Sequence, residues 1–144
     1  MGRIQWNNSL SIGVDEIDDQ HKKLIDLHNH LHDTILGLNG EDSNTVTKAA
    51  IKEMMDYTEH HFRCEQEYME KIGYPDVVTH IRLHSLFEDE VYQHFRAAIN
   101  GEYILPTQVI TLTKQWFHDH ITTEDRKIGE FIKIRREKVL QDNN

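Results

Sequence analysis

The sequence is poor in the residues that build disulfide-rich, all-β and membrane-spanning proteins. Its one cysteine, Cys64, has no partner for an internal disulfide. Two prolines and seven glycines are few for a chain of many short strands and turns. No apolar run approaches the roughly 18 residues that a membrane span needs, so we expect no membrane insertion. These absences favour a helical protein.

A secretion signal, a lipid anchor and a basic binding surface are also missing. Residues 1–16 contain no apolar run of the signal-peptide type, and Trp6 breaks the pattern for N-myristoylation at Gly2. Together with the single cysteine, this predicts a cytoplasmic protein. The 16 Lys and Arg are interspersed among 25 Asp and Glu, and the net charge is −9. We therefore expect no nucleic-acid partner.

What the sequence does contain is enough apolar material for one core and an excess of histidine. With 144 residues, 38% of them hydrophobic, the chain fits a single domain over residues 1–144. Histidine accounts for 11 of these residues. Where the histidines fall on the predicted helices decides whether they form a site.

Four segments have the spacing of amphipathic helices. In the first, apolar residues from Ile17 to Ile35 recur mostly three, four or seven apart, after an acidic group that favours a helix start. Pro106 and Thr107 open the fourth, which passes through Ile121. The second reaches Ile72, and the third runs from about Val77 to Ile99. Capping and turn residues separate the segments at 37–40, 42–45, 73–76 and 100–101.

Long helices joined by short connections favour an all-α protein, an antiparallel up-down four-helix bundle. Before the first helix we expect an irregular N-terminal segment that carries Trp6. Residues Phe131 to Leu140 have a helical pattern with basic charge along it. They predict a short C-terminal helical tail that packs on the bundle or trails from it.

Two helices each present a pair of metal-binding side chains on one face. Residues i and i+4 differ by only about 40° around a helix axis, so they point the same way. His61 and Glu65 form such a pair in the second helix. His80 and His84 form another in the third.

The first and fourth helices each direct a histidine toward the core. His21 shares a stripe with Leu24, and His120 follows Trp116 by one turn. A lone inward histidine is usually structural, and one H-x-x-x-H pair can arise by chance. Inward histidines on all four helices instead predict a metal, because buried imidazoles need partners. The segment 80–84 lacks the glutamate of H-E-x-x-H, which excludes a zincin protease.

These motifs occur in the order H, H-x-x-x-E, H-x-x-x-H and H-x-x-x-x-D, and with them the sequence resembles a bacterial hemerythrin. The resemblance spans about residues 6–129, which leaves 130–144 as the tail. The invertebrate relative myohemerythrin is an up-down four-helix bundle. The residues that carry the resemblance are Trp6, Ile17–Leu24, His61, Phe62, Glu65, Met69–Pro75, His80, His84, Trp116–Ile121 and Asp125.

The resemblance implies a non-heme centre of two iron ions, bridged by an oxo or hydroxo group, with five histidines and two carboxylates. One iron would be held by His80, His84 and His120, the other by His21 and His61, and Glu65 and Asp125 would bridge them. The second iron then has one ligand fewer and an open position. The residues that would line the oxygen pocket there are Leu24, Phe62, Trp116 and Phe117.

The carboxylate of the fourth helix is where helix periodicity and the resemblance disagree. Glu124 follows His120 by four residues and is the choice of a regular helix. Asp125 follows by five, which places it about 140° around the axis. Only the resemblance selects Asp125, and it requires a local distortion or two residues that straddle the iron pair.

The histidines outside the motif and Cys64 have less specific predictions. We expect His30, His32 and His60 to be solvated or to pack as ordinary side chains, because they lie off the ligand stripes. A position along the core, above or below the irons, is open to His28 and to His94. Cys64 is expected to be a buried or half-buried apolar side chain.

The resemblance implies reversible dioxygen binding rather than enzyme activity. Imidazole-rich ligation places less negative charge on the irons than carboxylate-rich ligation does, which disfavours high-valent iron and oxygenation. Dioxygen is the expected partner, and the sequence identifies no protein partner. Two alternatives remain: a sensor of oxygen or redox state, and a di-iron enzyme that acts on peroxide or nitric oxide.

Overall fold

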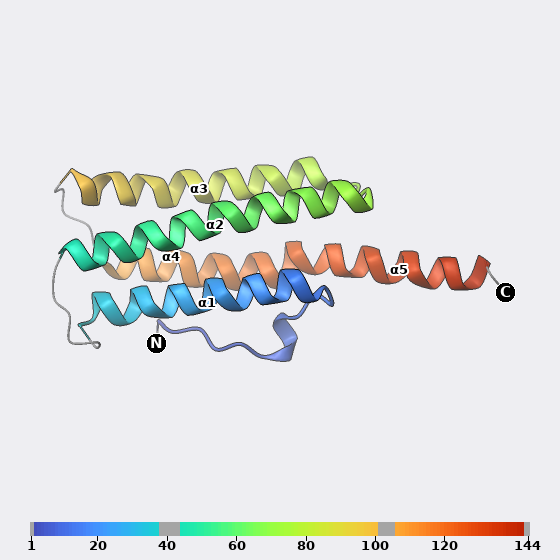
Figure 1. Ribbon diagram of the computed structural model, residues 1–144, viewed down its shortest axis with the longest axis horizontal. Coiled ribbons are helices and arrows are strands. Elements are labelled where there is room, and N and C mark those ends of the chain that lie inside the picture. The colour runs from blue at the N-terminus through green and yellow to red at the C-terminus, as the bar shows by residue number, and fades with distance from the viewer. Residues whose placement is uncertain (1, 38–43, 101–105, 143–144) are drawn as a thin grey trace.

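Four helices lie side by side in an antiparallel up-down bundle, as the sequence predicts (Figure 1). The computed structural model describes residues 2–37, 44–100 and 106–142, and within these ranges it contains no strand. The bundle helices are α1 (Asp15–Ile35), α2 (Asn44–Ile72), α3 (Val77–Ile99) and α4 (Pro106–Asp119). The predicted turn and capping residues 38–40, 42, 43 and 101 lie outside the described residues.

The turn between α2 and α3 is built by a glycine that ends the helix. Gly73 has a φ of 70°, a left-handed conformation that favours glycine. Its N–H donates to the carbonyl of Glu70 at 3.2 Å, and the N–H of Tyr74 donates to that of Met69 at 2.9 Å. These two bonds form a Schellman motif, which satisfies the last carbonyls of α2 and reverses the chain.

The fourth bundle helix and the tail form one continuous helical rod. Helix α4 passes at Asp119 into a π-helical segment, η2 (His120–Asp125), which continues into α5 (Arg126–Asp142). The predicted tail is therefore helical and trails from the bundle, but it begins earlier than Phe131. No proline interrupts the chain after Pro106, and Gly129 lies inside α5 without ending it.

The N-terminal residues form an irregular arm along α1, apart from the short 3₁₀ turn η1 (Asn8–Leu10). Ile4 exchanges two 2.8 Å hydrogen bonds with the side chain of Asn29 through its backbone N–H and carbonyl. At the other end, the Ile12 N–H donates to Asp18 at 2.9 Å. Gly129 lets this arm pass, because a Cβ there would lie 2.0 Å from the Ile12 carbonyl oxygen.

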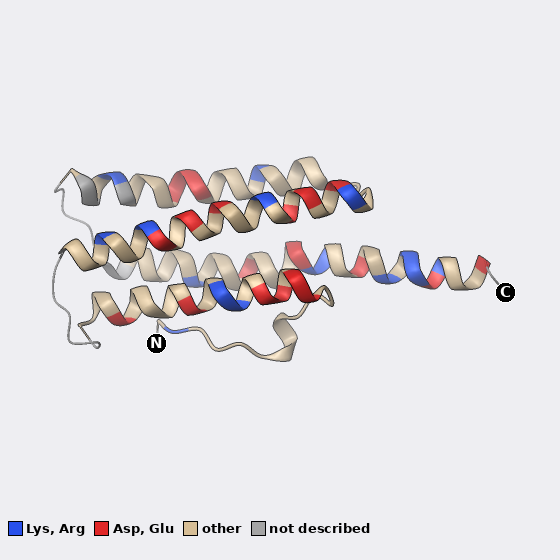
Figure 2. Ribbon diagram, in the orientation of Figure 1, with Lys and Arg blue, Asp and Glu red and all other residues tan. Residues whose placement is uncertain are grey.

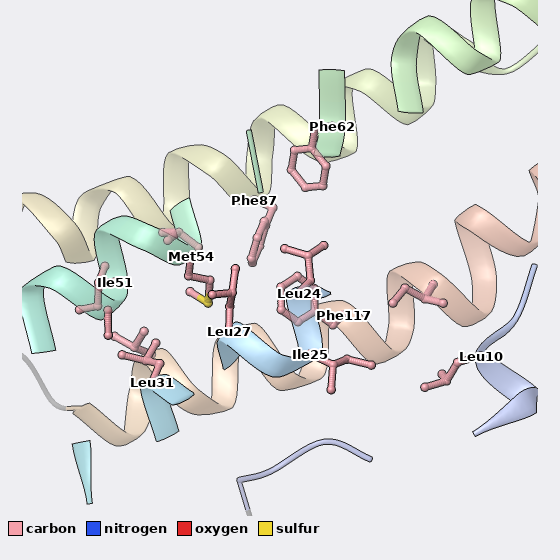
Figure 3. Close-up of a cluster of buried hydrophobic side chains, with 14 residues drawn as sticks. Leu10, Leu24, Ile25, Leu27, Leu31, Ile51, Met54, Phe62, Phe87 and Phe117 are labelled. Atoms are coloured by element: carbon pink, nitrogen blue, oxygen red, sulfur yellow. The ribbon is translucent and has the colours of Figure 1, made fainter. Parts of the chain in front are cut away.

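The larger hydrophobic cluster fills the interior of the bundle between the helices (Figure 3). It joins α1, α2, α3 and α4 through side chains such as Leu31, Ile51, Phe87 and Phe117. A smaller cluster packs α5 against the end of α2, and its buried members are Met69, Tyr74 and Ile128. Within the described ranges, no helix combines the length and apolar character that crossing a bilayer requires.

Candidate metal centre

The seven predicted ligands meet in the interior of the bundle, at the end where α4 passes into η2. They come from α1, α2, α3 and η2, and none is more than 5% exposed. Such a concentration of buried polar side chains requires partners that compensate for lost water. The seven are His21, His61, Glu65, His80, His84, His120 and Asp125.

Three histidines and one oxygen from each carboxylate form the first group. Nε2 of His80 lies 2.6 Å from Oε1 of Glu65 and 3.0 Å from Oδ1 of Asp125. Nε2 of His120 lies 3.0 Å from that of His84 and 3.1 Å from that of His80. One ligand atom from each of these five residues lies within 4.8 Å of all the others, the spacing of a metal site.

The second group contains two histidines and the other oxygens of the same carboxylates. Nε2 of His21 lies 3.0 Å from Oδ2 of Asp125 and 3.7 Å from Oε2 of Glu65. Nε2 of His61 lies 3.1 Å from Oε2 of Glu65. Each carboxylate thus turns one oxygen to each group, which is the geometry of a bridge between two cations.

The hydrogen bonding of the second group is incomplete within the described protein. Both ring nitrogens of His21, Oε2 of Glu65 and both oxygens of Asp125 are buried without a hydrogen-bond partner. Unsatisfied buried polar atoms are rare in native proteins, and bound cations would satisfy Nε2 of His21 and the carboxylate oxygens. Imidazole nitrogens and carboxylate oxygens suit first-row transition metals such as iron, so the residues fit a di-iron centre.

The electrostatics of the centre favour ionised carboxylates. Although burial opposes its charge, the neighbouring carboxylates of Asp125 and Glu65 raise the pKa of His21 to about 10. The same competition raises the pKa of His80 to about 9. Burial prevails at His84 and lowers its pKa to about 4. The neighbouring imidazoles hold the pKa of both carboxylates below their usual range despite burial.

Metal loading is expected to release at least two protons per chain near pH 7. The raised pKa values of His21 and His80 leave both imidazoles protonated in the metal-free protein. Because a metal binds only the deprotonated ring, affinity should fall as the pH is lowered. Anaerobic titration of the metal-free protein with Co²⁺ in weak buffer, with a pH indicator, measures the release. Release of less than one proton per chain would contradict this protonation of the site.

The π-helical segment explains how two residues five apart serve one site. A π-helix places residues i and i+5 in register, so Asp125 lies on the same side as His120, with Oδ1 3.1 Å from Nε2. The local distortion that the i+5 spacing requires is therefore present. Glu124, the choice of a regular helix, is half-buried elsewhere and lies 3.4 Å from Nζ of Lys127.

Two of the four predicted pocket residues stack on ligands of the first group. The Phe62 ring lies parallel to that of His84, with ring centroids 3.7 Å apart. Trp116 stacks on His120 with centroids 4.3 Å apart. Both aromatic side chains therefore hold imidazoles of the three-histidine group in place, while Phe62 also approaches His61 of the second group at 5.8 Å.

The other two predicted pocket residues belong to the hydrophobic cluster. Leu24 and Phe117 are buried close together in it (Figure 3). The ring of Phe117 contacts Phe87 at 5.9 Å and His28 at 6.3 Å between centroids. A role of Phe117 above the His21 and His61 pair stays a prediction.

The histidines outside the ligand set and Cys64 range from fully buried to exposed. His28 is buried in the bundle, where its ring nitrogens lie 2.7 Å from Oγ1 of Thr113 and 2.5 Å from the Gly2 carbonyl oxygen. His32 is buried, and His94 is half-buried. His30, His60 and His118 are exposed, and Cys64 is half-buried.

Gln20 is a residue of the site that the sequence did not indicate. Its Oε1 lies 2.6 Å from Nδ1 of His61, a contact from α1 to α2. If Nδ1 donates its proton to this oxygen, Nε2 keeps a lone pair for a metal. The sequence offers only indirect signals: Gln20 lies in the segment Ile17–Leu24 that carries the resemblance, and it precedes His21, although a helix turns neighbouring residues to different faces.

Replacing Gln20 with leucine is expected to lower metal affinity about 10–100-fold while the protein stays folded. The apolar side chain removes the acceptor that orients His61. Gln66→Leu is the matched control, since Gln66 bonds Glu70 on the outside of α2 at 3.2 Å. Competition with a chromophoric chelator measures both affinities. Equal affinities in the two variants would assign no positioning role to Gln20.

Comparisons with known proteins find a family model and relatives that match most of the chain. The family model described as the Hemerythrin HHE cation binding domain matches residues 12–132. A bacteriohemerythrin of Stenotrophomonas maltophilia (strain R551-3) is 32% identical over 143 residues, which cover 99% of this chain and 90% of the relative. A bacteriohemerythrin of Pseudomonas aeruginosa (strain UCBPP-PA14) is 27% identical over 144 residues, or 100% and 91% of the two chains.

Solved structures agree as well. A crystal structure of wild-type hemerythrin has a TM-score of 0.81 and 25% identity, and it covers 88% of this chain and 95% of that chain. A crystal structure of a hemerythrin point mutant has a TM-score of 0.82 and 25% identity, and the match covers 90% of this chain and 97% of that chain. With most of its length matched by the family model, the chain belongs to the hemerythrin HHE cation-binding family.

Proposed function

We propose that this protein binds dioxygen reversibly at a non-heme di-iron centre. In this assignment His80, His84 and His120 hold one iron, and His21 and His61 hold the other. Glu65 and Asp125 bridge the two ions. The observation that carries the proposal is the pair of adjacent ligand groups that share both carboxylates but differ by one histidine. Two ferrous ions held by these residues would supply the two electrons that reversible dioxygen binding requires.

The unequal groups determine where dioxygen binds. The group of His21 and His61 offers one nitrogen fewer than its neighbour, so a metal ion held there would have room for one more ligand. Gln20 orients His61 toward that ion and supplies no titratable proton.

The side chains around the centre favour binding over turnover. The Phe62 and Trp116 rings stack on the imidazoles of His84 and His120 and place apolar surface against them. Tyr74 lies 6.5 Å from the His80 ring between centroids. Burial raises its pKa to about 12, so the phenol keeps its proton at neutral pH. These neighbours supply no ready acid or base for peroxide or nitric oxide chemistry.

Repeated cycles of anaerobic reduction and exposure to air test the proposal. An oxygen carrier with two irons per chain returns to the same absorption spectra in every cycle. Continuous consumption of added peroxide or nitric oxide would identify an enzyme instead. A protein that stays metal-free after expression with adequate iron, or that holds one zinc ion, would contradict the di-iron assignment. We also propose that it works in the cytoplasm, where the free, half-buried Cys64 would stay reduced.

A further inference from the structure

The C-terminal turns of helix α5 extend beyond the end of the bundle. Figure 1 shows it projecting past the start of α1 and the end of α2. Every residue from 133 to 142 is exposed. Three of them are large apolar side chains, Ile134, Val139 and Leu140, which are 64%, 53% and 66% exposed. These residues lie beyond residue 132, where the match to the family model ends.

The base of this projecting helix forms one wall of an apolar groove of about 570 Å³. Tyr68 and Ile72 of α2 form the other wall. Arg135 fixes the two walls together, because its guanidinium donates to the carbonyl of Ile72 at the end of α2. Val139 and Leu140 of α5 also line this groove, and both side chains are more than half exposed. The groove is open to solvent.

The tail and the bundle end beside it carry opposite charges. Helix α5 contains six basic and three acidic side chains, so it carries +3 in a chain of −9 and leaves −12 on the remainder. Figure 2 shows blue residues along α5 and red residues at the start of α1 and the end of α2. The exposed acidic side chains there are Asp15, Glu16, Asp19, Glu67 and Glu70.

We propose that α5 is a docking helix for a second copy of this chain, in a two-fold dimer with antiparallel tails. Val139 and Leu140 of each tail enter the groove at Tyr68 and Ile72 of the other copy. The basic tail then faces the acidic bundle end of its partner. One chain supplies both the apolar segment and the groove, so the contact is self-complementary and closes at two copies. An anionic membrane would attract the tail but repel the remaining −12 charge of the protein.

Sedimentation velocity over a range of protein concentrations tests the dimer. The double variant Val139→Glu, Leu140→Glu should weaken association at least about tenfold, because it places four like charges in an apolar contact. Both residues are exposed in the single chain, so its fold and metal content should not change. Leu86→Glu is the matched control, since Leu86 is 59% exposed on α3. Added salt should weaken the wild-type dimer but not abolish it.

Cross-linking tests the two-fold arrangement. In a Cys64→Ser background, Arg136→Cys lies in the projecting segment, near the expected crossing of the two tails. Oxidation should link it to its copy, whereas Gln93→Cys on α3 should stay unlinked. A wild-type protein that remains monomeric at all concentrations would overturn the proposal. A dimer that is disrupted by Leu86→Glu but not by the double tail variant would overturn it as well. Tail-dependent binding of the monomer to phosphatidylserine vesicles would instead make α5 a membrane contact and also overturn it.

Discussion

Replacing Asp125 with asparagine is expected to lower the iron content from two ions per chain to one or none. Oδ1 of Asp125 lies 3.0 Å from Nε2 of His80, and Oδ2 lies 3.0 Å from Nε2 of His21, so the carboxylate serves both groups. Asparagine keeps the shape but loses the charge. Its amide nitrogen turns donor hydrogens toward one of the two sites. Both losses act on the same bridge.

Glu124→Gln is the matched control for this substitution. It removes one negative charge from the same π-helical segment, at a side chain that lies 3.4 Å from Nζ of Lys127. We expect this variant to keep both irons. Iron analysis after anaerobic reconstitution gives the ion count, and circular dichroism shows that the helix content is retained. Iron lost from Glu124→Gln but kept by Asp125→Asn would reverse the assignment of the bridge.

These two neighbouring acids also mark the limit of periodicity in this sequence. The period of about 3.6 residues predicted the helices and placed His61 with Glu65 and His80 with His84. Helix periodicity could not predict η2, because no spacing within the segment 120–125 indicates a π-helix. A regular helix would select Glu124, and only the resemblance to a family indicated Asp125. The π-helical distortion affects only residues 120–125. It could be predicted only from the full set of motifs along the chain that carries the resemblance.

Side-chain contacts between different helices could not be predicted from the sequence either. The bond from Gln20 to His61 joins positions 41 residues apart, and it depends on how α1 and α2 are rotated about their axes. The same holds for the stack of Phe62 on His84 between α2 and α3. Periodicity assigns a side chain to the buried face but does not choose its partner there. The ligand pairs within one helix could therefore be predicted, whereas the side chains that orient them required the fold.

Replacing Phe117 with alanine is expected to shorten the life of the oxygenated protein and to destabilise the fold. Phe117 is 2% exposed and packs against Phe87, so its truncation should cost about 3–5 kcal/mol of unfolding free energy. It also precedes His120 by about one turn on the rod that carries the site. If its ring excludes solvent from the open iron position, water and anions will enter faster without it. Iron content should stay at two, because no ligand is removed.

A second core variant separates the pocket role of Phe117 from its packing. Ile51 is 1% exposed and lies in the same hydrophobic cluster, well away from Phe62 (Figure 3). Ile51→Ala should cost about 2–5 kcal/mol of unfolding free energy. It should leave unchanged both the lifetime of the oxygenated protein and the rate at which an added anion such as azide enters the site. Thermal melting and decay of the oxygenated spectrum, measured on the same samples, compare the two variants. A normal lifetime in a destabilised but folded Phe117→Ala would show that this ring only fills the core, and the pocket would then have to be closed by other side chains such as Leu24.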